Sequence, residues 1–243
     1  MTNASQRKSR AKNKPSPVST PVAAPVSFRS GEKLDYAVHF SKLSNVATIQ
    51  LSVAERRDFF GKAAWHLQGA AHTVKPLRIV FVLDDQFDSY SDAATLACFQ
   101  YEMHLNERGQ QEDGVFRLTS EGDPAPPNAT AVRVLAGTRD PLGFVEYLRT
   151  LDWGQTKEVR GPVYDGRNLY EARAHLASDS TAVSVPAGSY TASRIEVRVF
   201  QNDVEMKDVH FWVSLAHDAA RTPVLLEAEL PIGSARVELT HAE

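Results

Sequence analysis

Cysteine is almost absent from this 243-residue chain, which contains only Cys98. A single cysteine cannot form an intramolecular disulfide, and without a Cys-x-x-Cys pair the sequence offers no cysteine-based metal or redox centre. Cys98 lies in the strand-like residues 96–100, so we expect it to be a small buried core residue. Because one thiol is compatible with the cytoplasm and with the periplasm, cysteine usage leaves the compartment open.

Long apolar runs and common catalytic motifs are also missing. No stretch approaches the roughly 20 apolar residues of a membrane-spanning helix, so we expect no transmembrane segment. The eight histidines form neither His-x-His nor His-Glu-x-x-His, and we therefore expect no metal site and no cofactor. The sequence has no phosphate-binding glycine loop and no Gly-x-Ser-x-Gly turn, and it singles out no catalytic residue.

Two polar clusters contain the right residue types for chemistry without the right pattern. Ser214, His217 and Asp218 invite comparison with a hydrolase triad, but side chains three apart on a strand point to opposite faces. We interpret them as a polar strand end and turn. The acidic cluster within residues 84–92 lacks the glycine and the terminal glutamate of an EF-hand loop. We interpret that cluster as a solvated edge.

Acidic residues are missing from the first 31 positions, which hold six of the 27 basic residues. All 30 acidic residues therefore lie in residues 32–243, which have a net charge of −9. An acidic body argues against a nucleic-acid-binding domain, and we expect no nucleic-acid partner. Residues 1–27 are basic and proline-rich, and we predict a disordered tail; contact with nucleic acid or anionic lipid is the alternative.

The same tail bears on the compartment. A secretory signal has a basic start followed by 7 to 15 apolar residues. Here the basic start is followed by four prolines, Pro15, Pro17, Pro21 and Pro25, so no signal peptide is recognisable. Three interpretations stay open: a cytoplasmic protein, a chain whose start is truncated or wrongly assigned, or an unusual tail before a folded domain.

Strand patterns dominate residues 28–243, which we predict to form a single domain. Apolar and polar residues alternate repeatedly, and glycine and proline punctuate the alternation as hairpin turns require. No strand–helix–strand spacing appears. The sequence therefore predicts a mainly β fold: a strongly curved antiparallel sheet, an open barrel or a β-spiral, of about a dozen strands with one or two short helices.

One helix is clearly indicated at residues 141–152. Asp140 suits the N-cap, Pro141 suits the first helical position, and Gly154 is expected to end the helix. Its apolar residues recur at the helical period.

Three other segments are not regular strands in the sequence pattern. Residues 76–83 are ambiguous between a helical turn and a strand. Residues 106–114 are expected to be a charged hairpin tip, and residues 121–130 a loop, because their three prolines cannot donate to a strand ladder.

A single amphipathic helix beside so many strands is expected to cover the open side of the curved sheet. Its apolar side chains would then face aromatic residues of the sheet across a concavity. If that space is open, it is a pocket for an acyl chain or another amphipathic ligand; if it is filled, it is the core. The helix residues in question are Phe144, Tyr147, Leu148, Leu151 and Trp153, and the sheet residues are Trp65, Phe99 and Trp212.

Several short motifs, in order along residues 28–240, resemble those of domain of unknown function family 3108, whose members are mostly exported proteins of Gram-negative bacteria. The first runs from Phe28 through Gly31 to Tyr36, and others lie at residues 140–149, 163–170, 185–190 and 212–224. The resemblance implies a curved, open-barrel-like sheet with one helix, similar in outline to periplasmic lipoprotein carriers. It implies a periplasmic location, with the cytoplasm as the alternative, and it supplies no catalytic residues. The acidic turn near His217 is longer than the family pattern.

From the residues and the resemblance together, we expect a non-enzymatic envelope protein that binds an apolar or amphipathic ligand, or a protein partner, in a helix-covered concavity. The alternatives are an interaction scaffold with a filled core and a hydrolase acting on envelope polymers. Arg149 and Asp165 both lie in the resembling motifs, and we interpret them as a structural salt bridge that anchors the helix to the sheet. The sequence does not indicate an oligomeric state.

Overall fold

The computed structural model describes residues 28–59, 61–119 and 127–243, apart from the side chain of Pro76. The tail expected at residues 1–27 and most of the loop expected at residues 121–130 lie outside these ranges. Within them, thirteen strands form one sheet in the order β7-β6-β5-β4-β3-β2-β1-β13-β12-β11-β10-β9-β8. The strands and helices are β1 Lys33–Phe40, β2 Leu43–Phe59, β3 Lys62–Thr73, η1 Lys75–Ile79, β4 Asp84–Asp92, β5 Cys98–Glu107, β6 Gln110–Thr119, β7 Thr130–Arg133, α1 Pro141–Thr150, β8 Glu158–Tyr164, β9 Leu169–Val185, β10 Gly188–Gln201, β11 Val204–Ala216, β12 Pro223–Leu230 and β13 Gly233–Ala242.

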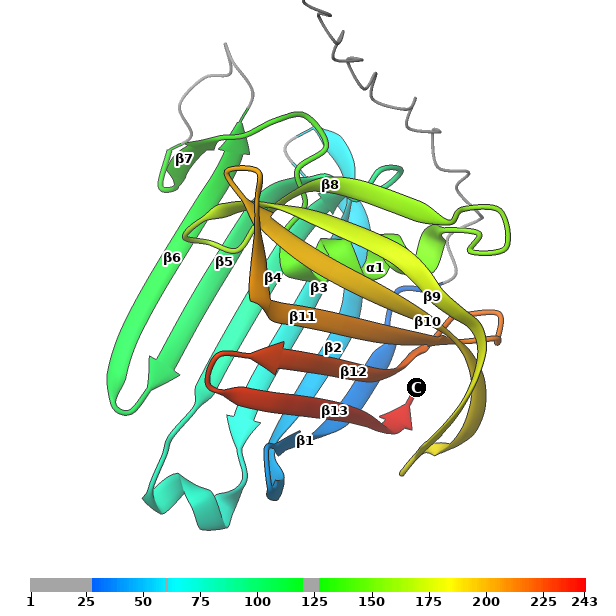
Figure 1. The fold of residues 1–243 in the computed structure, drawn as a ribbon. Coiled ribbons are helices and arrows are strands. Elements are labelled where there is room, and N and C mark those ends of the chain that lie inside the picture. Colours follow the sequence, from blue (N-terminus) through cyan, green and yellow to red (C-terminus); the bar gives the residue numbers. More distant parts are fainter. Residues whose placement is uncertain (1–27, 60, 120–126) are drawn as a thin grey trace, which may run out of the picture.

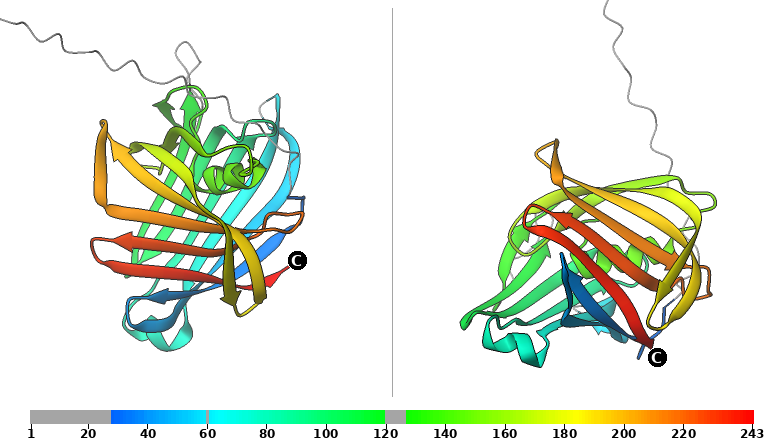
Figure 2. Two further views of the ribbon diagram at one scale, coloured as in Figure 1. Left: turned by 45° about the vertical axis from the view of Figure 1, so that its right-hand side comes forward. Right: turned by 60° about the horizontal axis from the view of Figure 1, so that its bottom comes forward.

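The sheet is a meander in which the first and last strands, β1 and β13, pair with each other. Neighbouring strands are antiparallel, except that β6 and β7 are parallel. Strong curvature turns the N-terminal strands β2–β6 to face the C-terminal strands β8–β12, with α1 between them (Figure 1; Figure 2). The expected fold class, a mainly β, strongly curved and open sheet with one α-helix, is confirmed.

Residues 138 and 139 connect β5 with the end strand β8. The Cys98 N–H donates to the Thr138 carbonyl, and Arg139 exchanges backbone hydrogen bonds with Pro162 and Tyr164 of β8. A two-residue bridge therefore links the start of β5 to β8. This bridge leads directly into α1, so it also fixes where the helix starts.

Two local expectations needed correction, and one ambiguity was resolved. Residues 106–114 are not a long tip, because β5 and β6 pair up to Glu107 and Gln110 and leave only Arg108 and Gly109 in the turn. Of the two structures left open for residues 76–83, the helical turn is present: residues 76–79 belong to the short 3-10 helix η1, and Leu83 makes an isolated strand bridge. The helix α1 ends at Thr150, before Gly154, because Leu151 is extended and the Trp153 indole N–H donates to the Leu148 carbonyl.

Candidate functional site

The start of α1 is held by a buried carboxylate. Asp140 is fully buried; its Oδ1 accepts from the Gly143 N–H at 3.0 Å, and its Oδ2 accepts from the Ser89 hydroxyl at 2.5 Å. Ser89 lies on the inner face of β4. One side chain therefore caps the helix and ties it to the N-terminal strands, as a cap followed by proline predicts. Burial raises the pKa of the nearby Cys98 thiol, and the Asp140 charge raises it further.

The end of α1 is held by Arg149, whose side chain has no exposed surface. Its guanidinium donates to Glu32 at 2.6 Å, to Glu146 at 2.8 Å and to the Ala220 carbonyl at 3.0 Å. Burial raises the pKa of Glu146, and the charge of Arg149 opposes that rise. The three charged groups join α1 to the segment before β1 and to the turn between β11 and β12.

Between these anchors, α1 and the C-terminal strands enclose a cavity of about 480 Å³. Its size falls within the range of small-molecule sites, about 300–1,000 Å³. Four helix residues form one wall, and the inner faces of β8–β12 form the other. The lining residues are Pro141, Phe144, Val145, Leu148, Val163, Asp165, Tyr170, Ala172, Val197, Val199, Met206, Val209, Phe211, Trp212, Val213, Leu226 and Glu227.

Only two charged residues, Asp165 and Glu227, are among the lining residues of the cavity. Asp165, in the turn between β8 and β9, accepts the backbone N–H groups of Arg167 and Asn168 through Oδ1. Burial raises the pKa of Tyr170, and the Asp165 charge adds to the rise. The Glu227 carboxylate lies on the outer face of the sheet, where it pairs with Arg194 and Arg236 at 3.0 Å each. The arrangement can hold an apolar chain, with a polar group placed near the β8–β9 turn.

The structure gathers only some of the predicted pocket residues. Phe144 and Leu148 line the cavity. Leu151 and Trp153 are buried in the adjoining filled core, together with Val159 and Ile195. The sequence analysis treated an open pocket and a filled core as alternatives. In the structure both are present, side by side under the same helix.

The aromatic residues expected to face the helix lie elsewhere. Trp65 packs edge-on against Phe28 in a separate cluster, with ring centroids 5.1 Å apart. Phe99 lies at the bulged start of β5, where the Lys62 ammonium is 4.9 Å from its ring. On the helix, Tyr147 points away from the cavity and lies 3.5 Å from the Arg139 guanidinium.

Trp212 belongs to the cavity wall, but strand alternation turns its ring outward. Its neighbours Phe211 and Val213 face inward, so Trp212 faces the opposite side of the sheet. There the Arg194 guanidinium lies 5.2 Å from the indole ring, and His210 packs edge-on against it. The expectation that this indole faces the helix across the concavity is therefore corrected by the period-2 geometry of β11.

Sequence reasoning missed the wall residues on β10 and β11. Val197 and Val199 alternate with charged residues on β10, a signal that was visible. Met206 and Val209 were not predictable, because their orientation depends on a register shift: Arg198 pairs with His210, whereas Phe200 pairs with Glu205. The extra residues of β11 bend the strand, and a bulge of this kind redirects side chains.

The predicted salt bridge between Arg149 and Asp165 does not form. Arg149 anchors the helix, but its carboxylate partners are Glu32 and Glu146. Asp165 instead stabilises the β8–β9 turn by accepting backbone N–H groups of that turn. The sequence indicated that Arg149 would be structural, whereas the choice among 30 carboxylates depended on tertiary proximity, since Glu32 lies 117 positions away.

The residues of the supposed hydrolase triad do not converge. Asp218 accepts from Thr222, and Ser214 is buried. His217 instead lies 3.0 Å from the Ser193 hydroxyl, at the edge of a second cavity of about 220 Å³. The Asp179 carboxylate accepts from the Ser193 hydroxyl at 3.4 Å. Within the described part of the chain, no carboxylate hydrogen-bonds His217 to orient its imidazole as in a triad.

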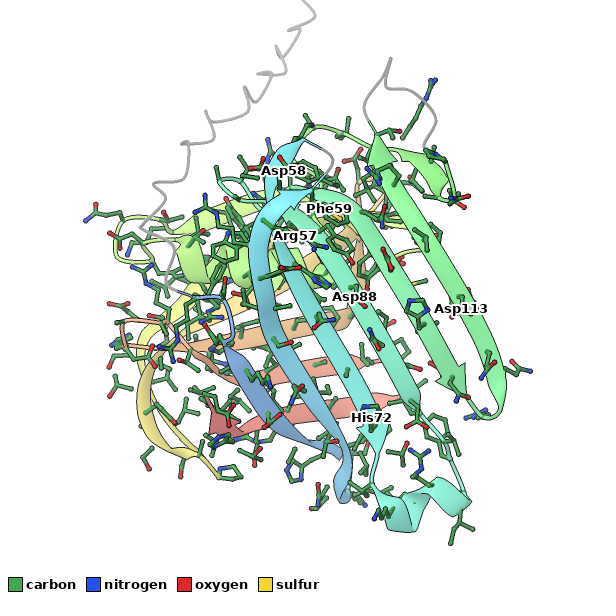
Figure 3. The ribbon with its side chains drawn as sticks, turned by 180° about the vertical axis from the view of Figure 1, so that it is seen from behind. Arg57, Asp58, Phe59, His72, Asp88 and Asp113 are labelled. Atoms are coloured by element: carbon green, nitrogen blue, oxygen red, sulfur yellow. The ribbon has the colours of Figure 1, made fainter. Side chains whose placement is uncertain are left out.

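The acidic cluster of β4 is not a solvated edge, because β4 is an interior strand and Asp85 and Asp88 are buried. Asp88 accepts hydrogen bonds from His66, Gln68 and Gln86 on the outer face of the N-terminal strands, which Figure 3 shows.

Across residues 28–59, 61–119 and 127–243, no group of three or more His, Cys, Asp or Glu side chains is placed to hold a metal ion. In the same ranges no helix is long and apolar enough to cross a membrane.

The chain matches a family model described as a protein of unknown function, DUF3108, over residues 35–240. No curated protein matches it in sequence. A crystal structure of a β-barrel-like protein of the domain of unknown function DUF1849, from Brucella abortus, is similar with a TM-score of 0.58 and 12% identity, over 87% of this chain and 96% of that chain. A predicted lipoprotein from Parabacteroides distasonis gives a TM-score of 0.41 and 9% identity, over 90% of this chain and 99% of that chain. The Brucella structure shows that the β-barrel-like fold is shared.

Proposed function

This chain belongs to the DUF3108 family, and from that premise we propose that it is a non-enzymatic protein of the bacterial cell envelope that holds an apolar or amphipathic ligand between α1 and strands β8–β12. The observation that carries the proposal is the cavity of about 480 Å³, whose lining is almost entirely apolar. Protein interiors are close-packed, and voids larger than a water molecule are few. A cavity of this size and chemistry is therefore best explained by an occupant.

The geometry favours a ligand with one long apolar part. Helix residues Phe144, Val145 and Leu148 and strand residues such as Val197 and Val199 offer contacts along its length. Of the two charged lining residues, Glu227 turns its carboxylate to the outer face of the sheet, and Asp165 lies in the β8–β9 turn. A polar headgroup would therefore lie near Asp165 and the chain along the apolar walls, as in other pockets that combine apolar walls with few polar groups.

A non-enzymatic role accords with the Ser193–His217 contact. A serine nucleophile needs a base that is itself oriented by another group. Among the described residues, no carboxylate hydrogen-bonds the His217 imidazole. This contact also lies at the second cavity, away from the residues that would hold the ligand. We assign the location to the envelope from the character of the family, with the cytoplasm as the alternative.

The test is native mass spectrometry of the full chain purified from Gram-negative cells, followed by solvent extraction and lipid analysis. We expect a co-purifying species of defined mass, recovered unhydrolysed after incubation. The double variant Val199→Trp/Val209→Trp should lower its occupancy by about tenfold or more, because the two indoles fill space that the ligand needs. These wall positions are half-buried, whereas Leu148 is fully buried and a polar substitution there threatens the fold.

The matched control is Val115→Trp, which adds the same bulk on the outer face of β6, opposite Glu102. It should retain the ligand. A clean mass for the unmodified chain, or full occupancy in the double variant, would overturn the proposal. The filled core around Leu151 and Trp153 would then favour the alternative, an interaction scaffold that recruits an envelope protein.

A further inference from the structure

The hairpin turns of this sheet divide between the two borders at which its strands end. Because neighbouring strands are antiparallel, every second turn of the meander lies on the same border. The turns β1–β2, β3–β4 and β5–β6 therefore lie on one border with the turns β8–β9, β10–β11 and β12–β13. Curvature spreads this border in space: in Figure 1 the strand ends β1–β2 and β3–β4 lie together at the bottom of the molecule, whereas the β10–β11 turn lies near the top.

Exposed apolar side chains concentrate on this border. Among the described residues, seven large apolar side chains are exposed, and six of them lie at these turns. The seventh, Leu135, follows β7 on the opposite border. The six are Leu43, Ile79, Val80, Leu169, Val204 and Ile232. Single exposed apolar residues are ordinary, but their segregation to one border of the sheet is not.

Four of the six occupy three adjacent turns, which we call the apolar rim: Leu43, Ile79, Val80 and Ile232. Backbone hydrogen bonds join the three turns, from Ser41 N–H to Ser234 O at 2.7 Å and from Val74 N–H to Val46 O at 3.1 Å. The exposed fraction is 92% for Ile79, 86% for Val80 and 79% for Ile232. These side chains project from turn tips.

The charge of the rim is of one sign. Residues 41–45, 74–83 and 230–234 contain Lys42, Lys75 and Arg78 and no acidic residue. The Arg78 guanidinium forms an ion pair with Asp84 through two hydrogen bonds of 2.5 Å. Lys42 and Lys75 form no ion pair with any of the described residues. Residues 32–243 as a whole have a net charge of −9. An approaching anionic surface would therefore meet a local basic end on an acidic body.

We propose that the apolar rim docks onto an anionic lipid surface, with Leu43, Ile79, Val80 and Ile232 entering the headgroup layer and Lys42 and Lys75 contacting phosphates. Apolar side chains projecting beside cations are what interfacial binding requires, since apolar burial and attraction to anionic lipid add. A protein partner would instead be expected to need a continuous complementary patch of about 800 Å² on this chain. Separate turn tips fit a fluid surface better.

The rim lies on the turns β1–β2, β3–β4 and β12–β13, whereas the cavity is lined by α1 and the strands β8–β12. The inference goes beyond the proposed function and can fail independently of it, because the rim residues and the cavity residues are different.

The test is flotation of the full chain with vesicles of phosphatidylethanolamine and phosphatidylglycerol. Leu43→Ser/Ile79→Ser/Val80→Ser/Ile232→Ser should weaken binding by about tenfold or more, because four exposed side chains lose their apolar surface. Lys42→Gln/Lys75→Gln should weaken binding to these vesicles and leave binding to phosphatidylcholine vesicles unchanged. Every variant keeps residues 1–27, so the basic tail contributes equally to all of them.

The matched control is Leu135→Ser, which removes an exposed leucine on the opposite border and should bind like the unmodified chain. A second readout uses Ile79→Cys and Leu135→Cys labelled with an environment-sensitive fluorophore, since Cys98 is buried. Vesicles should shift the emission at position 79 only. Unchanged flotation of the rim variants, or equal shifts at both positions, would overturn the proposal; loss of a protein partner in those variants would then identify the rim as a protein-binding edge.

Discussion

At the scale of single residues, the molecule depends on charged groups removed from water. Arg149 has no exposed surface and makes hydrogen bonds to Glu32, Glu146 and the Ala220 carbonyl. Burying charges is costly, and the cost is recovered only when every partner is present. The same principle applies on the outer face, where Asp88 is buried under His66, Gln68 and Gln86. Such residues are sensitive to substitution even without touching a ligand.

The first prediction concerns Arg149. Arg149→Met should lower the free energy of unfolding by about 3–5 kcal/mol, because it leaves two carboxylates buried without their cation. The measurement is the midpoint of chemical denaturation. As a control, Glu32→Leu/Glu146→Met/Arg149→Met removes all three charges and should recover most of the loss. If the triple variant is as unstable as the single one, the charge argument is wrong and packing is responsible.

The second prediction concerns acid. Burial acts to raise the pKa of Asp88, but hydrogen bonds from His66, Gln68 and Gln86 outweigh it and hold the pKa below its ordinary value. A carboxylate with a depressed pKa stabilises the fold above the unfolded-state pKa, near about 3.9, and that contribution is lost as the pH falls through the folded-state value. Asp88→Asn should therefore cost about 1–3 kcal/mol at neutral pH and lose less stability on acidification than the unmodified chain.

Urea unfolding at neutral pH and at about pH 3 measures this difference. The control is Asp203→Asn, at an exposed carboxylate in the β10–β11 turn, which should leave the pH dependence of stability unchanged. Parallel loss of stability in the Asp88 variant and the unmodified chain on acidification would contradict the argument.

At the scale of elements, α1 is too short to be stable by itself. A ten-residue helix is marginal in water, so its stability comes from its ends and from its packing. Asp140 provides the N-cap and also accepts from Ser89, while Arg149 fixes the last turn. The helix is thereby held against both the N-terminal and the C-terminal parts of the curved sheet. Its position, and with it one wall of the cavity, depends on these two anchors.

The third prediction concerns the cap. Asp140→Ala should lower the free energy of unfolding by about 2–3 kcal/mol, since it removes the cap and leaves the buried Ser89 without its carboxylate. Asp140→Asn preserves an acceptor for the Gly143 N–H and should cost less. Thermal unfolding compares the two. An equal loss for asparagine and alanine would mean that the charge, which both variants remove, rather than the cap holds the helix in place.

At the scale of the whole molecule, one curved sheet makes both features that bear on function. Curvature brings β8–β12 over α1 and so forms the cavity (Figure 2). The antiparallel order places alternate turns on one border of the sheet, and three adjacent turns of that border form the apolar rim. The ligand proposal and the docking proposal can be tested independently, because the variants in the β10 and β11 walls of the cavity leave the rim residues unchanged.

The sequence alone determined those properties that depend on neighbours in the chain. Strand alternation, the Asp140-Pro141 helix start and the family motifs are local patterns, and they predicted a curved, mainly β sheet with one helix, as well as the family itself. Two cavity residues, Phe144 and Leu148, followed from the period of the helix. These patterns are readable because side-chain direction repeats every two residues in a strand and about every 3.6 in a helix.

Only the tertiary structure decided which distant residues meet. Glu32 rather than Asp165 pairs with Arg149, and Trp65 and Phe99 lie away from the helix because strand pairing takes them elsewhere. The bulge in β11 turns Met206 and Val209 into the cavity. The common border of the exposed turns likewise required strand order. Such outcomes depend on register and curvature, which no local pattern in one sequence encodes.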